Sequence, residues 1–378
     1  MNKEVLIIGG GVIGLSIARE LHKRGVKRIN IIDAGECGRE ASWAAAGMLG
    51  PQAEADEAGA FFEFCRESRD LYPTLASELL DETGTDIELD PAGTLYLAFS
   101  DEDVRVLRMR FQWQKAAGLP VEHLDASEVR RAESFVSPDV REALFFPNDW
   151  QVDNRKLCSA LRRYCEFNGI EINENTRVDR LITDLGRVTG VRARSVSYPA
   201  DQIVVAAGAW TTQILFGERQ LPLKVVPIRG QMVAFHTAKR LFERVIYSSG
   251  GYIVPRRDGR ILAGSTTEEA GFDREPTDSA AASLSTMACG IAPGLVNLEI
   301  ADRWAGLRPR SPDGFPVIGR IEGIDGLYLA TGHYRNGILL APATAQIVAA
   351  DIVEGRLSDY APVFGTDRFR LRAVRTGN

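Results

Sequence analysis

The chain has 378 residues, a formal net charge of −6, 45% hydrophobic residues and 25% charged residues. This length is enough for two domains or one elaborated domain with a sizeable core. The acidic balance argues against a nucleic-acid-binding protein, because such proteins present strongly basic surfaces.

The cysteine content indicates a reducing compartment. The five cysteines form no CxxC pair and are odd in number, which argues against a disulfide framework or a zinc site. The sequence enters a strand-like run directly, without the features of a secretory leader. No uninterrupted apolar stretch approaches the roughly 18 residues that a membrane span needs. We therefore expect a cytoplasmic protein with no membrane span and no metal.

The first elements predict a βαβ unit. Residues 4–8 (EVLII) contain a continuous apolar run after Glu4, as in a strand buried on both faces. From Val12 onward apolar residues recur four apart, which predicts a helix that ends near Gly25. Residues 28–33 then predict a second strand.

The remaining elements alternate between two kinds of pattern. Helices are predicted over 58–83, 101–117, 153–168 (capped by Asp153), 273–292 and 338–354; strands over 84–100, 176–198, 202–207 and 326–330; and an antiparallel sheet over 223–265. Nucleotide-binding patterns thus lie at both ends and in the middle of the chain. We predict a discontinuous α/β domain with a second, β-rich domain inserted into it.

A GxGxxG motif, Gly9-x-Gly11-x-x-Gly14, lies between the first strand and the first helix. In this context the glycines allow a tight turn and let a pyrophosphate approach the helix N-terminus. Asp33 follows Gly14 by nineteen residues, where an acid can accept hydrogen bonds from ribose hydroxyls. The motif predicts a dinucleotide but does not separate NAD from FAD.

The loop at residues 39–50 (REASWAAAGMLG) is rich in small residues. Alanine and glycine leave room for a flat ring beside the backbone, and Ser42 is placed to contact phosphate. Close packing alone also explains such a composition. The loop therefore favours a flavin without deciding the question.

Five stretches together resemble the D-amino-acid oxidase superfamily of FAD enzymes: GxGxxG at 9–14, AAAGML at 44–49, VVAAGAW at 204–210, WAGLRP at 304–309 and GHYRNGILLAP at 332–342. The resemblance runs to about residue 370 and is strongest to the glycine oxidase branch of thiamine thiazole biosynthesis. It implies a Rossmann-like FAD-binding domain of the glutathione-reductase type. Its segments are residues 1–84, 146–222 and 301–378, and residues 85–145 and 223–300 form an antiparallel substrate-binding domain.

The resemblance also implies the cofactor site. Val178 matches the position whose backbone meets the adenine, residues 44–49 match the loop beside the flavin, and residues 333–339 match the turn facing the flavin C2 oxygen and N1. Relatives that attach flavin covalently use a cysteine near residues 308–316, where this chain has none, so FAD is expected to be non-covalent. The implied cofactor residues are Gly9, Gly11, Val12, Ile13, Gly14, Asp33, Ala34, Ser42, Trp43, Ala46, Gly47, Met48, Leu49, Val178, Gly208, His333, Tyr334, Arg335, Asn336, Gly337, Ile338 and Leu339.

At the substrate end, Tyr252 and Arg308 match positions that hold a carboxylate, and Arg335 matches a residue near the substrate. The implied reaction is hydride transfer from Cα to flavin N5, giving an imine, with dioxygen reduced to hydrogen peroxide. The implied substrates are glycine, sarcosine and small D-amino acids. Gly250 and Thr267 replace a His and a Met that the branch can carry, which leaves the substrate range open.

Two other functions compete with an oxidase. A D-amino-acid dehydrogenase would pass the electrons to a quinone or carrier, and a non-catalytic FAD-binding subunit would perform no chemistry. The presence of Tyr252, Arg308 and Arg335 argues against the second of these. The expected partners are a small amino acid and O2, and the resemblance suggests a homotetramer.

Overall fold

The computed structural model describes residues 4–216, 219–221 and 223–369, so the ends of the predicted first and last segments lie outside it. Its first sheet has six strands in the order β20 (Val317–Arg320), β21 (Leu327–Thr331), β12 (Gln202–Val205), β1 (Glu4–Ile8), β2 (Arg28–Ile32) and β8 (Glu171–Asn173). All neighbours are parallel except β20 and β21. The predicted βαβ unit is present as β1, α1 (Val12–Lys23) and β2.

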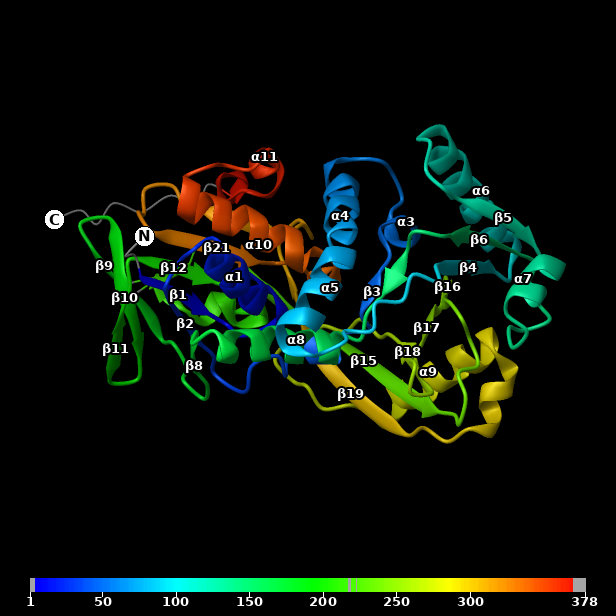
Figure 1. The fold of residues 1–378 in the computed structure, drawn as a ribbon. Coiled ribbons are helices and arrows are strands. Elements are labelled where there is room, and N and C mark those ends of the chain that lie inside the picture. The colour runs from blue at the N-terminus through cyan, green and yellow to red at the C-terminus, as the bar shows by residue number, and fades with distance from the viewer. Residues whose placement is uncertain (1–3, 217–218, 222, 370–378) are drawn as a thin grey trace.

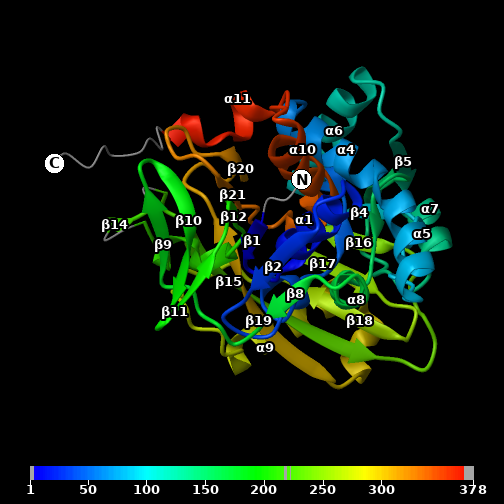
Figure 2. The same cartoon turned by 60° about the vertical axis from the view of Figure 1, so that its left-hand side comes forward.

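Both faces of this sheet are covered, which explains the continuous apolar run of β1 (Figures 1 and 2). Val5 and Ile7 pack with the helices α1, α8 (Asn154–Phe167) and α10 (Gly337–Glu354). Leu6 and Ile8 face a five-stranded sheet on the other side. Its strands are β11 (Val196–Pro199), β10 (Arg187–Ala193), β9 (Arg180–Asp184), β13 (Leu215–Phe216) and β14 (Arg219–Gln220), in that order.

The helix α10 is 18 residues long and apolar enough to cross a membrane by length and composition, contrary to the expectation from the sequence. However, 72% of it is buried inside the fold, where it packs against α1 and α4. A helix that is apolar all round is also typical of the core of a protein.

A second sheet of eight strands runs in the order β19 (Asp302–Arg310), β15 (Val226–His236), β18 (Arg260–Gly264), β17 (Gly251–Pro255), β16 (Val245–Ser248), β4 (Thr94–Ala98), β6 (Glu142–Phe146) and β5 (Glu122–Asp125). Its pairs are antiparallel except β16 with β4, which are parallel. The sheet is antiparallel as predicted within residues 223–265, and the parallel pair lies where the two predicted segments of this domain meet. The two strands come from distant parts of the chain, so no hairpin fixes their relative direction.

The other elements complete the layers. Around the second sheet lie α6 (Asp101–Ala116), α7 (Ala126–Ala132), α9 (Asp278–Ile291) and η2 (Pro293–Asn297). Short elements join the two sheets or end the chain: α2 (Ala41–Ala44), β3 (Met48–Leu49), α3 (Pro51–Glu54), β7 (Trp150–Gln151), η1 (Gly208–Gln213), α11 (Ala361–Phe364) and η3 (Thr366–Phe369).

Three predicted elements differ in detail. The helix predicted over 58–83 is two helices, α4 (Ala60–Asp70) and α5 (Tyr72–Thr83), because Pro73 lacks the N–H that a continuous helix requires. Of the strands predicted over 84–100, only β4 forms. β19 lies in the eight-stranded sheet, although the prediction placed residues 301 onward in the first domain. The division into domains stays a prediction.

Candidate functional site

A cavity of about 720 Å³ lies where the six-stranded and eight-stranded sheets meet. Its lining comes from the loops that follow β1, β2 and β12, from residues 40–50, from β19 and from the start of α10. Ligands of open α/β sheets bind in this position, beyond the carboxyl ends of the strands. The sequence-predicted phosphate loop and substrate residues therefore share one cavity.

Two positions of the predicted phosphate loop, Gly9 and Gly14, have no space for a side chain. Gly9 has φ +108°, and a Cβ there would lie 2.3 Å from the Ala206 carbonyl oxygen. A Cβ on Gly14 would lie 1.9 Å from the Gly9 carbonyl oxygen, so Gly14 allows α1 to approach the loop. The Val12 N–H donates to Ser42 Oγ at 3.0 Å. The open first turn of α1 faces the cavity, which suits an anion.

Asp33 closes the other side of this loop at the end of β2. Its carboxylate accepts hydrogen bonds from the Gly10 N–H at 2.7 Å and the Gly35 N–H at 2.8 Å. Burial raises the pKa of the Asp33 carboxyl, and these two N–H groups oppose that shift. The side chain is thus fixed at the cavity wall beside Ala34 and Val178.

The small-residue loop forms a wall that close contacts hold in place. A Cβ on Gly306 would lie 2.5 Å from the Ala44 Cβ, and Trp304 Nε1 donates to the Ala44 carbonyl at 2.9 Å. Gly47 has φ +72°, and a Cβ there would lie 2.0 Å from the Val152 carbonyl oxygen. No larger residue fits at these glycines without moving the wall.

Arg256 anchors the same wall from behind. Its buried guanidinium donates to the carbonyls of Ala46 at 2.8 Å and Val152 at 2.8 Å, and to Asn154 Oδ1 at 3.0 Å. Burial lowers the pKa of Arg256 to about 10, so the side chain is still charged at neutral pH. The charge is stabilised by backbone carbonyls of the wall itself.

Replacing Arg256 with methionine should lower the free energy of unfolding by about 3 kcal/mol, because buried acceptors lose a charged donor. Arg257→Met is the matched control, since Arg257 is half exposed and pairs with Asp86. Urea unfolding of both variants measures the difference. Equal stabilities would show that the wall does not depend on Arg256.

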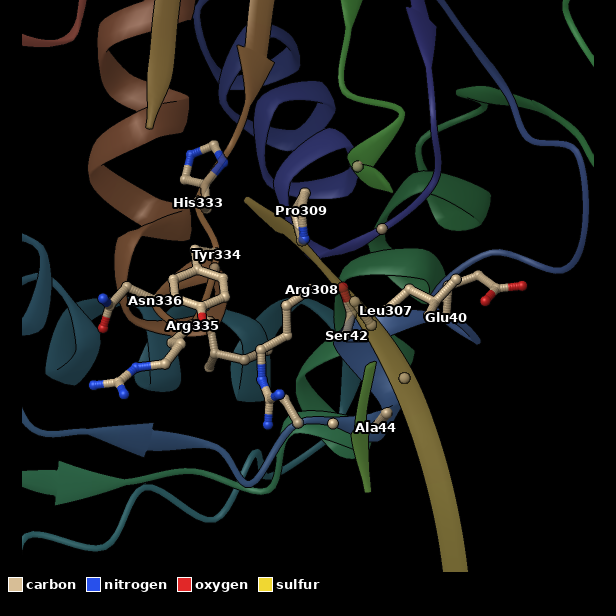
Figure 3. Close-up of a pocket in the computed structure, with 18 of the residues that line it drawn as sticks. Glu40, Ser42, Ala44, Leu307, Arg308, Pro309, His333, Tyr334, Arg335 and Asn336 are labelled. Carbon is tan, nitrogen blue, oxygen red and sulfur yellow. The ribbon is translucent and has the colours of Figure 1, made fainter. Parts of the chain in front are cut away.

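The turn before α10 brings polar groups to one side of the cavity (Figure 3). Tyr334 has a left-handed φ of +48°, and its N–H donates to the Pro309 carbonyl at 2.9 Å. His333 is buried, with Nε2 3.0 Å from Thr344 Oγ1. Burial lowers the pKa of His333 to about 3, so this imidazole is neutral near pH 7.

The guanidinium of Arg308 also lines this side of the cavity. Its guanidinium donates to the Thr266 carbonyl at 3.0 Å and to Ser265 Oγ at 2.7 Å, and a Cβ on Gly230 would lie 2.0 Å from it. Among the residues that the structure describes, no carboxylate pairs with Arg308. Burial raises the pKa of the neighbouring Tyr252 phenol, which therefore stays protonated. Together the two side chains offer donors to a carboxylate.

Arg335 is engaged differently. It forms an ion pair with Glu54 at 3.2 Å, and Glu54 also lies 3.5 Å from the Tyr247 hydroxyl. Glu54 belongs to α3, whose first N–H groups, those of Gln52 and Ala53, donate to the buried Asp149 carboxylate. Sequence reasoning missed Glu54 and Tyr247, because neither lies in a motif and Glu54 is 281 positions from Arg335.

Comparison with known proteins assigns the family. Residues 4–350 match the DAO family model, described as FAD dependent oxidoreductase. The chain is 38% identical over 365 residues to a protein named glycine oxidase from Pseudomonas aeruginosa, with 96% of this chain and 98% of that relative covered. The chain is a member of this FAD-dependent oxidoreductase family. The resemblance seen in the sequence is thereby confirmed.

Solved structures agree with the family assignment. A glycine oxidase from Geobacillus kaustophilus superposes with a TM-score of 0.89 at 34% identity, covering 95% of this chain and 97% of that one. An iminodiacetate oxidase from Chelativorans superposes with a TM-score of 0.87 at 27% identity, covering 96% and 98%. The fold is therefore that of the DAO-type FAD enzymes, as predicted.

The residues present fit FAD. The glycine-lined loop would hold the diphosphate at the start of α1, Asp33 the ribose, and the alanine wall with the start of α10 the flavin ring. All of these regions line the same cavity. A side chain at Gly9 or Gly47 would collide with the backbone of Ala206 or Val152, respectively. The protein is a FAD-dependent oxidoreductase, and the assignment of individual residues to FAD remains a proposal.

Most of the predicted residues of this oxidoreductase meet in the cavity. Those lining it are Tyr252, Arg308, Arg335, Gly9, Gly11, Val12, Ile13, Asp33, Ala34, Ser42, Ala46, Gly47, Met48, Val178, Gly208, His333, Tyr334, Asn336, Gly337 and Ile338.

Four predicted cofactor residues do not line the cavity. Leu49 and Leu339 are buried in the helical core, since their neighbours Met48 and Ile338 take the cavity positions. The Arg155 guanidinium carbon lies 3.6 Å from the centroid of the Trp43 ring, and Trp43 packs edge-on against Trp304. Gly14 serves the approach of α1 to the loop described above.

Proposed function

We propose that this enzyme oxidises glycine and other small primary or secondary amino acids, including sarcosine and D-alanine, to the imine. The observation that carries the proposal is Arg308, a guanidinium without a described acidic partner, beside the protonated Tyr252 in the cavity that the phosphate loop also lines. Relatives named glycine oxidase at 34–38% identity support the same substrate class.

The chain's own residues supply binding and orientation. Arg308 and Tyr252 would fix the substrate carboxylate, so that the α-carbon faces the alanine wall. Bound FAD supplies the hydride acceptor at N5 and, after reaction with dioxygen, the route to hydrogen peroxide. No general base is needed when the amine enters uncharged. This suits a site in which His333, the one histidine among the described lining residues, is buried and bonded to Thr344.

The substrate range depends on two positions that line the cavity. Gly250 carries no side chain, and a Cβ there would lie 3.6 Å from Met287, which is ordinary contact distance. Thr267 is the second such position. Their small size leaves room beside the α-carbon, so we include small D-amino acids among the substrates.

The biological role is proposed from a second group of relatives. The chain is 35% identical over 380 residues to a bifunctional protein ThiO/ThiG from Trichormus variabilis, covering 56% of that protein. We propose that the imine product enters thiamine thiazole biosynthesis. We further propose non-covalent FAD, a homotetramer, the two-domain division given above and a cytoplasmic location; the five free cysteines support the last of these.

Anaerobic reduction tests the proposed activity. Mixing the yellow holoenzyme without oxygen with glycine, sarcosine, D-alanine or D-proline should bleach the flavin absorbance, and admitting air should restore it with formation of peroxide. Bleaching with glycine but no peroxide in air would favour a dehydrogenase that uses a quinone or carrier. No bleaching with any amino acid would favour a non-catalytic FAD-binding subunit.

A further inference from the structure

A strap of the chain, residues 265–277, connects β18 to α9 and contributes Ser265, Thr267 and Arg274 to the cavity lining. At its base Arg229 of β15 pairs with Glu268 at 2.6 Å and with Asp273 at 2.5 Å. Arg310 of β19 pairs with Glu269 at 2.6 Å. The strap is thus fastened to the eight-stranded sheet by several ion pairs.

Two contacts connect this strap to the nucleotide side of the cavity. Phe272 packs on Trp210 of η1, with ring centroids 5.8 Å apart, and Trp210 lines the cavity. Arg274 forms an ion pair with Glu40, and both of these side chains also line the cavity. Glu40 precedes Ser42, whose hydroxyl accepts from the first turn of α1. Burial is the main cause that raises the pKa of Asp33, and the nearby Glu40 carboxylate adds to that shift.

The negative charges near the phosphate loop would need a cation to balance them when FAD binds. Glu40 and Asp33 present two carboxylates beside the loop that would receive the doubly charged diphosphate of FAD. Like charges in such proximity disfavour binding unless a counter-charge intervenes. In Figure 3 Glu40 lies beside Ser42, on the opposite side of Arg308 from Arg335. Arg274 is the guanidinium that meets Glu40 there.

The Arg274–Glu40 ion pair is expected to contribute little to the stability of the fold. The Arg274 and Glu40 side chains are 52% and 36% exposed, and ion pairs this exposed contribute little to folding. We propose that Arg274 is a FAD-retention residue. Its guanidinium neutralises Glu40 next to the diphosphate, and it fastens the strap over the nucleotide half of the cavity, which slows FAD release.

The rate of FAD release from the holoenzyme tests this role without any substrate, and so separately from the proposed oxidation of glycine. Release is followed by the recovery of free FAD fluorescence on dilution. Arg274→Gln should accelerate release by roughly tenfold at low salt, and the difference should shrink as salt screens the charges. Arg303→Gln is the matched control, because Arg303 is 47% exposed, pairs with Asp278 and does not line the cavity.

The partner residue supplies a second variant. Glu40→Gln removes the carboxylate that Arg274 neutralises, so adding it to Arg274→Gln should restore the part of the slow release that depends on charge. The part that depends on the fastened strap should stay lost. Equal release rates for the Arg274 and Arg303 variants would overturn the proposal. So would an Arg274→Gln protein with lowered thermal stability but unchanged FAD release, because the pair would then serve only the fold.

Discussion

Replacing Arg308 with alanine is expected to weaken the binding of glycine or an unreactive carboxylate analogue by about 2–5 kcal/mol, the range for removing one partner of a desolvated charge pair. The loss has a simple cause. The substrate carboxylate would enter a cavity in which, among the described residues, every other lining arginine except Arg177 already pairs with an acidic side chain. Perturbation of the flavin spectrum on titration measures the binding constant.

Arg303 is the control for this experiment. It lies on the same strand, pairs with Asp278 and does not line the cavity, so Arg303→Ala should keep the affinity for glycine. Arg308→Ala should also retain its yellow colour, because the phosphate loop is unchanged. An unaltered affinity for glycine in a yellow Arg308→Ala protein would remove Arg308 from the substrate site.

Replacing Gly11 with valine is expected to abolish retention of FAD, with a rise in Kd of roughly a hundredfold or more, equivalent to about 3 kcal/mol. Gly11 has φ −72° and ψ 179°, which valine adopts readily. Its Cβ would lie 3.3 Å from Ser42 Oγ, a tight contact that a small shift relieves. The fold should therefore survive while the side chain fills space beside the start of α1.

Absorbance at purification and thermal unfolding together measure this effect. The control is Gly294→Val, because a Cβ on Gly294 meets no atom within 4 Å and Gly294 does not line the cavity. A Gly11→Val protein that is folded and colourless supports the phosphate-loop assignment. A fully loaded yellow variant would show that the diphosphate does not approach Gly11.

Local patterns in the sequence were sufficient for the first sheet. The βαβ unit could be predicted because Leu6 and Ile8 face one core while Val5 and Ile7 face the other, which leaves no polar position in the run. The phosphate loop could be predicted because its three glycines lie within six consecutive residues, 9–14. The direction of β4 against β16 could not be predicted, because that pairing joins segments about 150 residues apart.

The candidate site shows the same division between local and distant information. Arg308 and the α10 turn lie within short motifs, so the sequence could place them at the cavity. Motif membership could not tell that Leu49 and Leu339 turn into the core, since one position along an element reverses or rotates a side chain. The engagement of Arg335 by Glu54 depends on the fold alone, as does the stacking of Trp43 under Arg155.

In the proposed substrate site, the pairing of Arg335 with Glu54 and of Arg110 with Asp56 would limit the net charge that a substrate can carry. With those two cations compensated, Arg308 beside Tyr252 would bind a single anionic group. Arg177, which bonds to the neutral Gln213, precedes Val178, the residue proposed to meet the adenine. A zwitterion or an amine with one carboxylate matches that demand, whereas aspartate or another dianion would carry a surplus negative charge past Glu54. The enzyme should accordingly discriminate against acidic side chains by charge before size becomes relevant.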